Sequence, residues 1–429
     1  MKTIFSAFFL LVFSAAPYAQ KALKLISIKE TERIERVLSS DEMQGRRTFT
    51  PGIEKAANFI AAEFEKTGLQ KWKNGNSFLQ SFSMVRSKAI SQTILVNGAV
   101  LDAKKAIVVS PSAQVLADNN AGYEVVSIGA GMNFVAETRK ALGTKKNTVV
   151  FVDTSHANMF GRFAQMRSQL YSTQPNVIMV LVDKTPSTFS VDLKQEITEM
   201  PLANVVGVIP GKSRPNEYVI FSGHYDHLGI NSKKMENNDS IYNGANDDAA
   251  GTTAMIMLAK YFKKLNNNER TLVFAAFTAE EIGGFGATYF SKQFDPVEVM
   301  AMFNIEMIGT ESKWGKNSAY ITGFEKTTMG EILQNNLKGT GFTFHPDPYP
   351  TQQLFYRSDN ATLARLGVPA HTISTSKMDS EPNYHKVSDE IGTLDMQNMA
   401  AIIRAIALSS KGIVSGKETP TRVDVSALR

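Results

Sequence analysis

The fold is indicated most clearly by residues 218–265, where an apolar run, a polar cluster and a helical pattern follow one another. Residues 218–226 read Y-V-I-F-S-G-H-Y-D, and Tyr218–Phe221 has the composition of a buried strand. Residues 244–265 read G-A-N-D-D-A-A-G-T-T-A-M-I-M-L-A-K-Y-F-K-K-L. Apolar residues three and four positions apart within this second stretch predict a helix over Ala249–Leu265. A strand followed by such a helix is typical of α/β proteins.

Strands and helices continue to alternate downstream of this stretch. Apolar strands are predicted at Leu272–Phe277, Val299–Ile305, near Tyr320–Thr322 and near Pro369–Ile373, and helices at Thr327–Leu337 and Leu394–Leu408. The alternation predicts an α/β fold with a mostly parallel, mixed central sheet that is covered by helices.

The chain upstream of residue 210 has a different character. Helices are predicted at Ile28–Leu38 and Gly52–Thr67; short strands at Thr93–Val96, Ala106–Val109, Glu124–Ile128, Thr148–Val152 and Val177–Val182; and one further helix at Phe160–Tyr171. We therefore expect a main domain of residues 21–99 and 200–412 and an inserted β-rich domain of residues 100–199. Residues 413–429 are expected to form a polar, loosely held tail.

Composition excludes several classes of protein. The chain has 429 residues, of which 43% are hydrophobic and 20% charged, so it is neither disordered nor a collagen or coiled coil. The 46 Lys and Arg residues exceed the 41 Asp and Glu residues only slightly and form no basic stripe. We therefore expect no nucleic-acid partner.

The first twenty residues have the pattern of a secretory signal peptide. Lys2 supplies the positive charge, Ile4–Ala16 is an uncharged, mostly apolar run of 13 residues, and small residues follow near Ala19. A membrane-spanning helix needs about 20 apolar residues, so this run is too short to be one. Since the chain has no cysteine, it has neither a lipid-anchoring cysteine nor a disulfide. We expect export to a periplasm or to the outside, with no stable membrane anchor after signal removal.

Four polar clusters follow the predicted strands or open the helix at Ala249, where ligands bind in open α/β sheets, and a fifth lies in a downstream loop. The clusters are Gly223–Asp226, Gly244–Gly251, Thr278–Glu281, Asn304–Gly309 and, far downstream, Tyr384-His385. Each has an ordinary explanation on its own: His224 as a core histidine, Asp248 as a helix cap, Glu280-Glu281 as surface charge. Together, however, two histidines and several carboxylates at one sheet edge need positive counter-charge. A pair of divalent cations supplies it, and mixed imidazole and carboxylate ligands suit zinc.

These clusters, in this order, resemble the co-catalytic di-zinc aminopeptidase family, whose superfamily includes glutamate carboxypeptidases, glutaminyl cyclases and the transferrin receptor. Residues 38–47, Pro51-Gly52 and 367–370 also resemble that family. The resemblance covers most of residues 30–90 and 200–410 and implies a three-layer zinc-exopeptidase fold for the main domain. The segment from Thr148 to Val182 is similar to a protease-associated domain, which implies a lid or wall beside the site.

The resemblance also implies roles for individual residues. One zinc would be held by Asp247, Glu281 and His385, and the other by His224, Asp247 and Glu306, with Asp247 bridging both. Asp226 would accept the second ring N–H of His224. Glu280 resembles the general base that takes a proton from the metal-bound water and passes it to the leaving amine. Tyr384 resembles a tyrosine that hydrogen-bonds the oxyanion.

This chain departs from the family pattern in two places. The family often has Asp where this chain has Glu306, so that ligand is one methylene longer. In the segment Arg357-Ser358-Asp359-Asn360 the family would have His at position 360, and capping of a helix by Ser358 or Asp359 is the default interpretation. Four other histidines match no ligand position and are interpreted as structural or surface residues: His156, His227, His345 and His371.

The predicted function is that of a periplasmic or secreted di-zinc aminopeptidase acting on peptides, with Glu280 and Glu306 recognising the free amino group. Cobalt or manganese are possible substitutes for zinc in vitro. A zinc carboxypeptidase is the main alternative, with Arg357 as the one candidate for binding a C-terminal carboxylate. A glutaminyl cyclase needs only one zinc, and a non-catalytic receptor-like homologue would have lost ligands. The oligomeric state is left open.

Overall fold

The computed structural model describes residues 16–166 and 170–428. Residues 1–15, most of the predicted signal peptide, lie outside these described ranges. Within them, no helix combines the length and the apolar character needed to cross a membrane.

The chain forms two compact units. One consists of the chain up to Ser81 together with Ala203–Arg429, and the other is Phe82–Leu202. The chain leaves the first unit along strand β2 (Leu79–Val96) and returns along strand β10 (Phe189–Ile209).

The main sheet of the first unit runs in the order β17-β16-β18-β15-β11-β14-β10. β11 pairs in parallel with β14 and with β15, and β15 pairs in parallel with β18, whereas β10 and β16 join their neighbours β14 and β18 antiparallel. The prediction of a mostly parallel, mixed sheet is confirmed. The strands not yet given are β11 (Arg214–His224), β14 (Arg270–Phe277), β15 (Val299–Ile305), β16 (Ser318–Ile321), β17 (Thr343–Pro346) and β18 (Ala370–Ser374).

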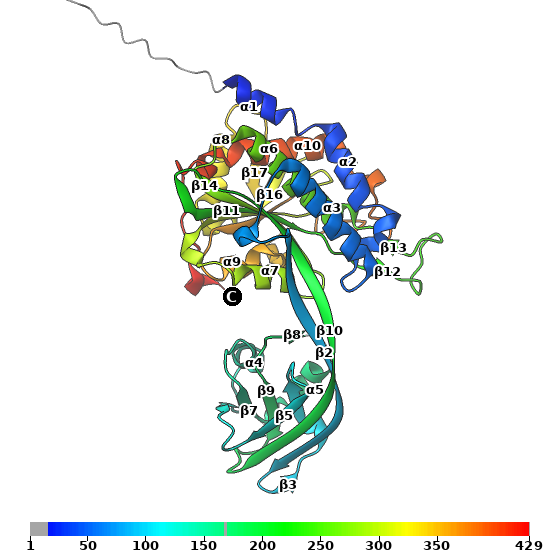
Figure 1. Ribbon diagram of the computed structural model, residues 1–429, viewed down its shortest axis with the longest axis vertical. Helices are drawn as coiled ribbons and strands as arrows, with labels where there is room; N and C mark the ends of the chain where they lie inside the picture. The colour runs from blue at the N-terminus through cyan, green and yellow to red at the C-terminus, as the bar shows by residue number, and fades with distance from the viewer. Residues whose placement is uncertain (1–15, 167–169, 429) are drawn as a thin grey trace, which may run out of the picture. The chain divides into compact units, whose positions relative to one another are not determined.

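Alternate side chains of the central strands face opposite helical layers. In β11, Val219 and Phe221 pack into the core that includes helices α2, α3, α6 and α10, whereas Ile220 packs with α7 and α9. Phe221 stacks on Phe274 and Phe303, with ring centroids 5.6 and 4.8 Å apart. Figure 1 shows the sheet between these two layers, so the predicted three-layer arrangement is confirmed. The helices are α2 (Ile28–Leu38), α3 (Pro51–Thr67), α6 (Ala250–Leu265), α7 (Phe285–Ser291), α9 (Asn360–Ala364) and α10 (Met396–Ser409).

Local sequence signals explain where the first helices begin and end. Ser27 caps α2, because its hydroxyl oxygen accepts a hydrogen bond from the backbone N–H of Glu30 at 3.2 Å. Helix α3 begins with Pro51, which needs no N–H partner there, and ends at Gly68 with φ 76°, a conformation that glycine adopts freely. Both helices lie where the sequence predicts them.

The C-terminal segment is packed, so the prediction of a loosely held tail is wrong. Ile413 and Val423 are buried, and the guanidinium of Arg270 donates a hydrogen bond to the carbonyl oxygen of Glu418 at 2.7 Å. The prediction fails because only a few residues of this mostly polar segment are buried, too few to form a hydrophobic pattern.

The second unit contains a four-stranded sheet in the order β4-β9-β7-β6. Its strands coincide with four predicted strands: β4 (Ala106–Val109), β6 (Glu124–Ile128), β7 (Thr148–Asp153) and β9 (Val177–Val182). Helix α5 (Ala157–Met166) ends earlier than predicted, because Leu170–Tyr171 pairs with β2 as strand β8. Helix α4 (Phe134–Leu142) is missing from the prediction, since only a narrow stripe of its residues is buried.

The unit boundary at Phe82 also differs from the predicted boundary at residue 100. The predicted short strand Thr93–Val96 is the end of the 18-residue strand β2. Residues 86–93 of that strand carry no buried side chain, so no hydrophobic pattern marks them. The resemblance of this segment to a protease-associated domain stays a prediction.

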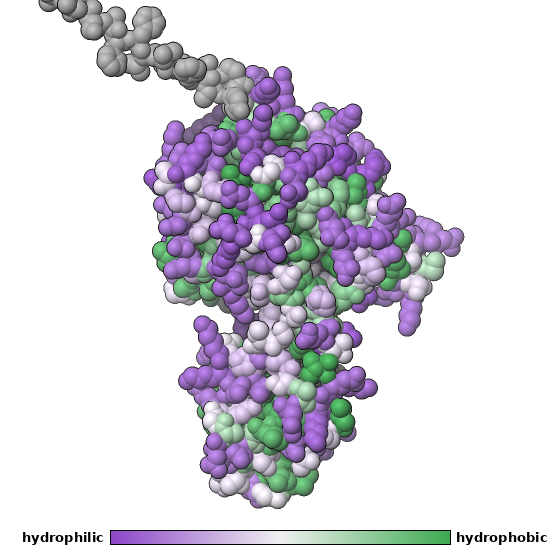
Figure 2. All heavy atoms as spheres, in the orientation of Figure 1, coloured by the Kyte–Doolittle hydropathy of each residue, from purple (hydrophilic) through white to green (hydrophobic). Residues whose placement is uncertain are grey.

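Hydrophilic side chains cover most of the visible face of both units, with apolar ones scattered among them (Figure 2). In the first unit Trp314, Leu366 and Ile282 are among the exposed large apolar residues. Single exposed apolar residues are normal on a folded chain in water. The unusual polar chemistry of this protein lies instead at the sheet edge.

Candidate metal centre

Three parallel strands bring their carboxyl ends to one edge of the sheet. β11 ends at His224, which stands opposite Phe277 of β14, and Ser222 stands opposite Asn304 of β15. Glu280 and Glu281 follow β14, and Glu306 follows β15. The register therefore places the predicted polar clusters next to each other.

Asp247 reaches the same edge from the segment that precedes α6. The first turn of α6, which follows this segment, approaches β15 closely: a Cβ on Gly251 would lie only 2.0 Å from the carbonyl oxygen of Ile305, so no larger residue fits. Asp248 precedes the helix, and its carboxylate accepts a hydrogen bond from the N–H of Gly251 in the first turn at 2.9 Å. It also accepts from the N–H of Met307 at 3.1 Å, and this ties the segment to the end of β15.

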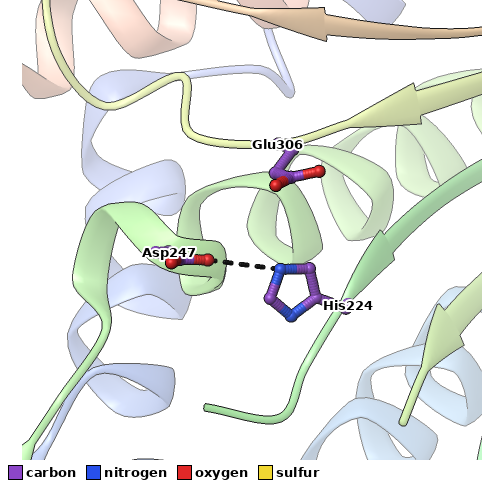
Figure 3. A group of neighbouring side chains, drawn as sticks. All are labelled: His224, Asp247 and Glu306. Atoms are coloured by element: carbon purple, nitrogen blue, oxygen red, sulfur yellow. Dashed lines mark ion pairs between the residues drawn. The ribbon is translucent and has the colours of Figure 1, made fainter. Parts of the chain in front are cut away.

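One group of ligand atoms is formed by His224, Asp247 and Glu306 (Figure 3). Their ligand atoms lie within 4.8 Å of one another, and Nε2 of His224 is 3.2 Å from Oδ1 of Asp247. Nδ1–H of His224 donates to the backbone carbonyl of Asp226 at 3.0 Å, in the tautomer that leaves Nε2 free. This group contains the three residues predicted to hold one zinc.

A second group surrounds the other carboxylate oxygen of Asp247. Nε2 of His385 lies 3.3 Å from Oδ2 of Asp247 and 3.3 Å from Oε2 of Glu281. His227 approaches as well: its Nδ1 is 2.7 Å from Oε1 of Glu281 and 3.9 Å from Oδ2 of Asp247. The prediction that His227 is a structural or surface residue is therefore wrong. The position of His227, directly after the predicted cluster His224-Tyr225-Asp226, is the sequence signal that indicates a place in the site.

The distances fit tetrahedral zinc. With bonds of about 2.0–2.1 Å, the ligand atoms of a tetrahedral ion lie roughly 3.3 Å apart, whereas charge-assisted hydrogen bonds are about 2.7–2.9 Å long. The contacts of Asp247 with His224 and His385, and of His385 with Glu281, measure 3.2–3.3 Å. In addition, Nε2 of His224 and Oε2 of Glu306 are buried and form no hydrogen bond with any described residue. The donor set thus offers free ligand atoms on both sides of Asp247.

The charge balance of the site leads to the same conclusion. Burial raises the pKa of Glu280 well above its ordinary value, and the neighbouring carboxylates of Glu306 and Asp359 raise it further, although His224 lowers it. Burial also raises the pKa of Glu306, and it raises that of Asp359 to about 8. At neutral pH these carboxyl groups need either protons or cations for compensation.

Asp226 occupies a different position from the predicted one. Its carboxylate accepts hydrogen bonds from the backbone N–H groups of Glu280 at 3.0 Å and Glu281 at 3.3 Å. Its backbone carbonyl, not its carboxylate, accepts the ring N–H of His224. β14 ends beside Asp226, and the backbone N–H groups of Glu280 and Glu281 in the loop after this strand, not the ring of His224, point at the Asp226 carboxylate. Asp226 therefore fixes the loop that carries Glu280 and Glu281.

Strained backbone surrounds the ligands. Ala279, Met307 and His385 have φ values of 61°, 53° and 57°, in the left-handed region that favours glycine. Each such conformation costs about 1–3 kcal/mol and persists only where the surrounding structure holds it. Ala279 and Met307 adjoin Glu280 and Glu306, so the strain lies where the functional side chains must be aimed.

Two buried residues without a predicted role hold the loop before α6. Asp389 accepts hydrogen bonds from the backbone N–H groups of Asn246 at 2.8 Å and Asp247 at 3.0 Å. Arg46 is fully buried and donates to the carbonyl oxygens of Tyr225 at 2.8 Å and Gly244 at 2.9 Å. The sequence contains Arg46 within the family-like opening segment, but nothing local indicates its distant partners.

Helix capping by Ser358 or Asp359, the default interpretation of that segment, is wrong. The hydroxyl of Ser358 accepts a hydrogen bond from the amide of Asn304 at 2.7 Å, and α9 has no side-chain cap. Both carboxylate oxygens of Asp359 are buried and have no hydrogen-bond partner among the described residues. The segment therefore faces the site.

Three further histidines lie outside both ligand groups, as predicted. His371 is buried between Thr327 and Thr322, to which its ring nitrogens are hydrogen-bonded at 2.7 and 2.8 Å. His345 stacks on Trp314, and Nε2 of His156 contacts the carbonyl oxygen of Gly129.

A pocket opens beside Glu306. Its apolar surface comes from Met307, Tyr320, Leu354 and Met378, and Tyr384 also lines it. The Tyr384 ring stacks on His385 with centroids 3.9 Å apart. The hydroxyl of Tyr320 is occupied, because it donates to the carbonyl oxygen of Ser376 at 3.0 Å. The pocket thus combines apolar and polar walls; Glu306 of one ligand group lines it, and Tyr384 stacks on His385 of the other.

Comparison with known proteins agrees with this geometry. Residues 204–409 match the sequence model described as peptidase family M28, and all five predicted ligands lie inside that range. The chain contains a peptidase family M28 domain. The M28 domain corresponds to the part of the first unit that carries the sheet edge described above, and M28 is the family of co-catalytic zinc exopeptidases that the sequence resembles.

Individual relatives are more distant. A "Probable zinc metalloprotease" from Pyrenophora teres f. teres is 31% identical over 120 residues, which is 28% of this chain and 25% of that protein. A "Probable leucine aminopeptidase" from Trichophyton verrucosum is 27% identical over 206 residues, 46% of this chain and 53% of that protein. The chain thus spans about a quarter to a half of these relatives.

A solved structure covers nearly the whole chain. The aminopeptidase from Aneurinibacillus sp. strain AM-1 aligns with a TM-score of 0.56 and 15% identity over 96% of this chain and 98% of that one. At this identity the likeness establishes the fold of the M28 domain and nothing finer.

Proposed function

We propose that the protein is a two-zinc exopeptidase that removes N-terminal residues from peptides. The observation that carries the proposal is that His224 and His385 lie 3.2 and 3.3 Å from the two oxygens of Asp247, a spacing that suits ligands of tetrahedral zinc. Glu306 lies within 4.8 Å of the first pair, and Glu281 lies 3.3 Å from His385. His224 and Glu306 would hold one ion and Glu281 and His385 the other, with Asp247 shared.

Each remaining group has a step to perform in peptide hydrolysis. When bound, the two cations supply Lewis-acid polarisation of water and of the scissile carbonyl, and offset the charge of the oxyanion. Glu280 takes a proton from the attacking water and passes it to the leaving amine, a role suited to its raised pKa. Asp226 holds the backbone of Glu280 in place, and the Tyr384 hydroxyl donates a hydrogen bond to the oxyanion.

An aminopeptidase also needs a site for the first residue of the peptide. The carboxylates of Glu280 and Glu306 would accept the free ammonium group, and the pocket beside Glu306 would receive the first side chain. Arg357 lines the same pocket, and its side chain donates to Gln352 but forms no ion pair with any residue of the described ranges, an observation that favours a carboxypeptidase as the second candidate.

We also propose that the protein is exported. Removing residues 1–20 as a signal peptide would leave Ala22 and Ile26, which are buried in the core of the first unit, in the mature chain. The N-terminal residue of the protein, isolated from its source and determined by mass spectrometry, tests this: an intact Met1 would contradict export by cleavage.

The central experiment combines Glu280→Gln with measurement of metal content and of hydrolysis of aminoacyl-anilides and N-blocked peptides. We expect two zinc ions per chain in both proteins, release from free N-termini only, and a loss of about 10²–10⁴-fold in kcat for the variant. Glu298→Gln, at an exposed position, is the control and should retain full activity. C-terminal cleavage of blocked peptides would favour the carboxypeptidase, and absence of turnover in the wild-type protein would contradict both enzymes.

A further inference from the structure

We infer that His227 is a positioning residue that holds Glu281 so that only its Oε2 atom faces the metal. This inference rests on the proposed two-zinc function. Nδ1 of His227 lies 2.7 Å from Oε1 of Glu281, while Oε2 of the same carboxylate lies 3.3 Å from Nε2 of His385. The two oxygens of Glu281 thus have different partners.

The distances separate His227 from the ligands. Its 2.7 Å contact with Glu281 has the length of a charge-assisted hydrogen bond and is shorter than the roughly 3.3 Å edge of a tetrahedral zinc site. Its Nδ1 is 3.9 Å from Oδ2 of Asp247, longer than that edge. His385, in contrast, is 3.3 Å from both carboxylates. The ligand atoms of His227, Asp247 and Glu281 lie within 4.8 Å of one another, as those of a metal site would, but the 2.7 Å contact gives His227 the geometry of a hydrogen-bond donor, whereas His385 has that of a ligand.

The ring of His227 is fixed by its surroundings. The residue is buried, and its backbone N–H donates to the carbonyl oxygen of Arg46 at 3.3 Å. One face of the ring lies against Gly244, where a Cβ would stand 2.5 Å from the ring carbons. Apart from Glu281, the charged groups that face the ring are Asp247 and Asp389. The other ring nitrogen, Nε2, is buried and has no hydrogen-bond partner among the described residues, so the ring proton belongs on Nδ1, where it faces Glu281.

The hydrogen bond has a consequence for metal binding. A free glutamate can bind a cation through one oxygen or both and can rotate between these modes. With Oε1 engaged by His227, Glu281 offers a single oxygen, which suits a four-coordinate site. Hydrogen-bond partners of metal ligands typically contribute about 10–100-fold to metal affinity. The effect should be confined to the ion held by Glu281 and His385, since His227 touches neither His224 nor Glu306 in the described contacts.

The test compares His227→Leu, which removes the donor, with His227→Asn, whose amide N–H can replace Nδ1–H. The two dissociation constants for zinc are measured on the full chain by competition with a chromophoric chelator, and thermal unfolding of the metal-free proteins is measured in parallel. We expect His227→Leu to weaken one of the two sites about 10–100-fold and the other by less than about 3-fold. His227→Asn should restore most of that loss.

Three results would overturn the inference. Unchanged zinc affinity in His227→Leu would show that the hydrogen bond is not needed. Equal weakening of both sites, together with a lower unfolding temperature of the metal-free variant, would assign His227 a purely structural role. Failure of His227→Asn to retain more affinity than His227→Leu would exclude the donor as the cause. If the wild-type protein bound no zinc, the proposed function itself would fail, and the wild-type titration alone reveals that case.

Discussion

Replacing Arg46 by methionine should destabilise the first unit strongly, although this residue touches no metal ligand side chain. The guanidinium is fully buried and donates to four backbone carbonyls, those of Leu38, Tyr225, Asn243 and Gly244. These carbonyls belong to three segments far apart in the sequence. Methionine fills similar space but donates no hydrogen bond.

Opposing contributions set the size of the effect. Each carbonyl left without a donor costs about 1–3 kcal/mol when it stays buried. Against this, burying the charge of Arg46 is itself unfavourable, since burial lowers the pKa of the guanidinium in the folded protein, and the variant avoids this cost. Removing one member of a buried charged network typically costs about 3–5 kcal/mol in net free energy of unfolding. For the first unit, which has about 300 residues and therefore an unfolding entropy of roughly 0.65 kcal/mol/K, that is a fall in Tm of roughly 5–8 °C.

The assay is thermal unfolding of the full chain, with and without a chelator. Arg47→Met is the matched control, since Arg47 is the exposed neighbour, and its Tm should stay within about 1–2 °C of the wild type. Because Arg46 joins segments rather than metal ligands, the loss should persist in the chelated protein. A Tm of Arg46→Met within about 2 °C of the wild type would refute the reasoning, as would a loss seen only in the metal-loaded form.

Two further predictions concern a buried acid and the pocket. Burial raises the pKa of Glu35 to about 8 although a hydrogen bond from Thr253 lowers it, so the folded protein retains this proton while the unfolded chain, with an ordinary pKa of 4.5, loses it. The stability contributed by the protonated Glu35 is therefore lost as pH rises from about 5 to 8. Chemical denaturation should show that the free energy of unfolding of the wild type falls by about 3 kcal/mol relative to that of Glu35→Gln over this range. Parallel pH profiles of the two proteins would contradict the raised pKa of Glu35. Because Met307, Leu354 and Met378 give the pocket an apolar surface, leucyl-, methionyl- and phenylalanyl-anilides should be hydrolysed with higher kcat/KM than glutamyl- or lysyl-anilides. Leu354→Gln should lower kcat/KM for the leucyl substrate about 10-fold or more and leave the alanyl substrate within a few-fold; equal losses for both would place the first side chain elsewhere.

Local sequence patterns predict much of this architecture. Helix α2 and strands β4, β6, β9 and β15 lie where hydrophobic spacing predicts them, because each pattern depends on residues within one short segment. The carboxylates and histidines that follow apolar strands, such as His224 and Glu306, were also foreseeable. Parallel strands end at one edge of a sheet, so residues that follow them must meet there.

The partners inside the site depend on tertiary structure. His227 contacts Glu281 across 54 residues of sequence, and Arg46 reaches the carbonyl of Tyr225 across 179. Whether the carboxylate or the carbonyl of Asp226 meets His224 depends on the register between β11 and β14, which no local pattern encodes. The sequence does not predict the full length of strand β2, because hydrogen bonds to neighbouring strands, and not buried apolar side chains, stabilise its exposed middle. Local sequence thus specifies which elements form and which chemical groups they carry, whereas packing and register specify which of those groups touch.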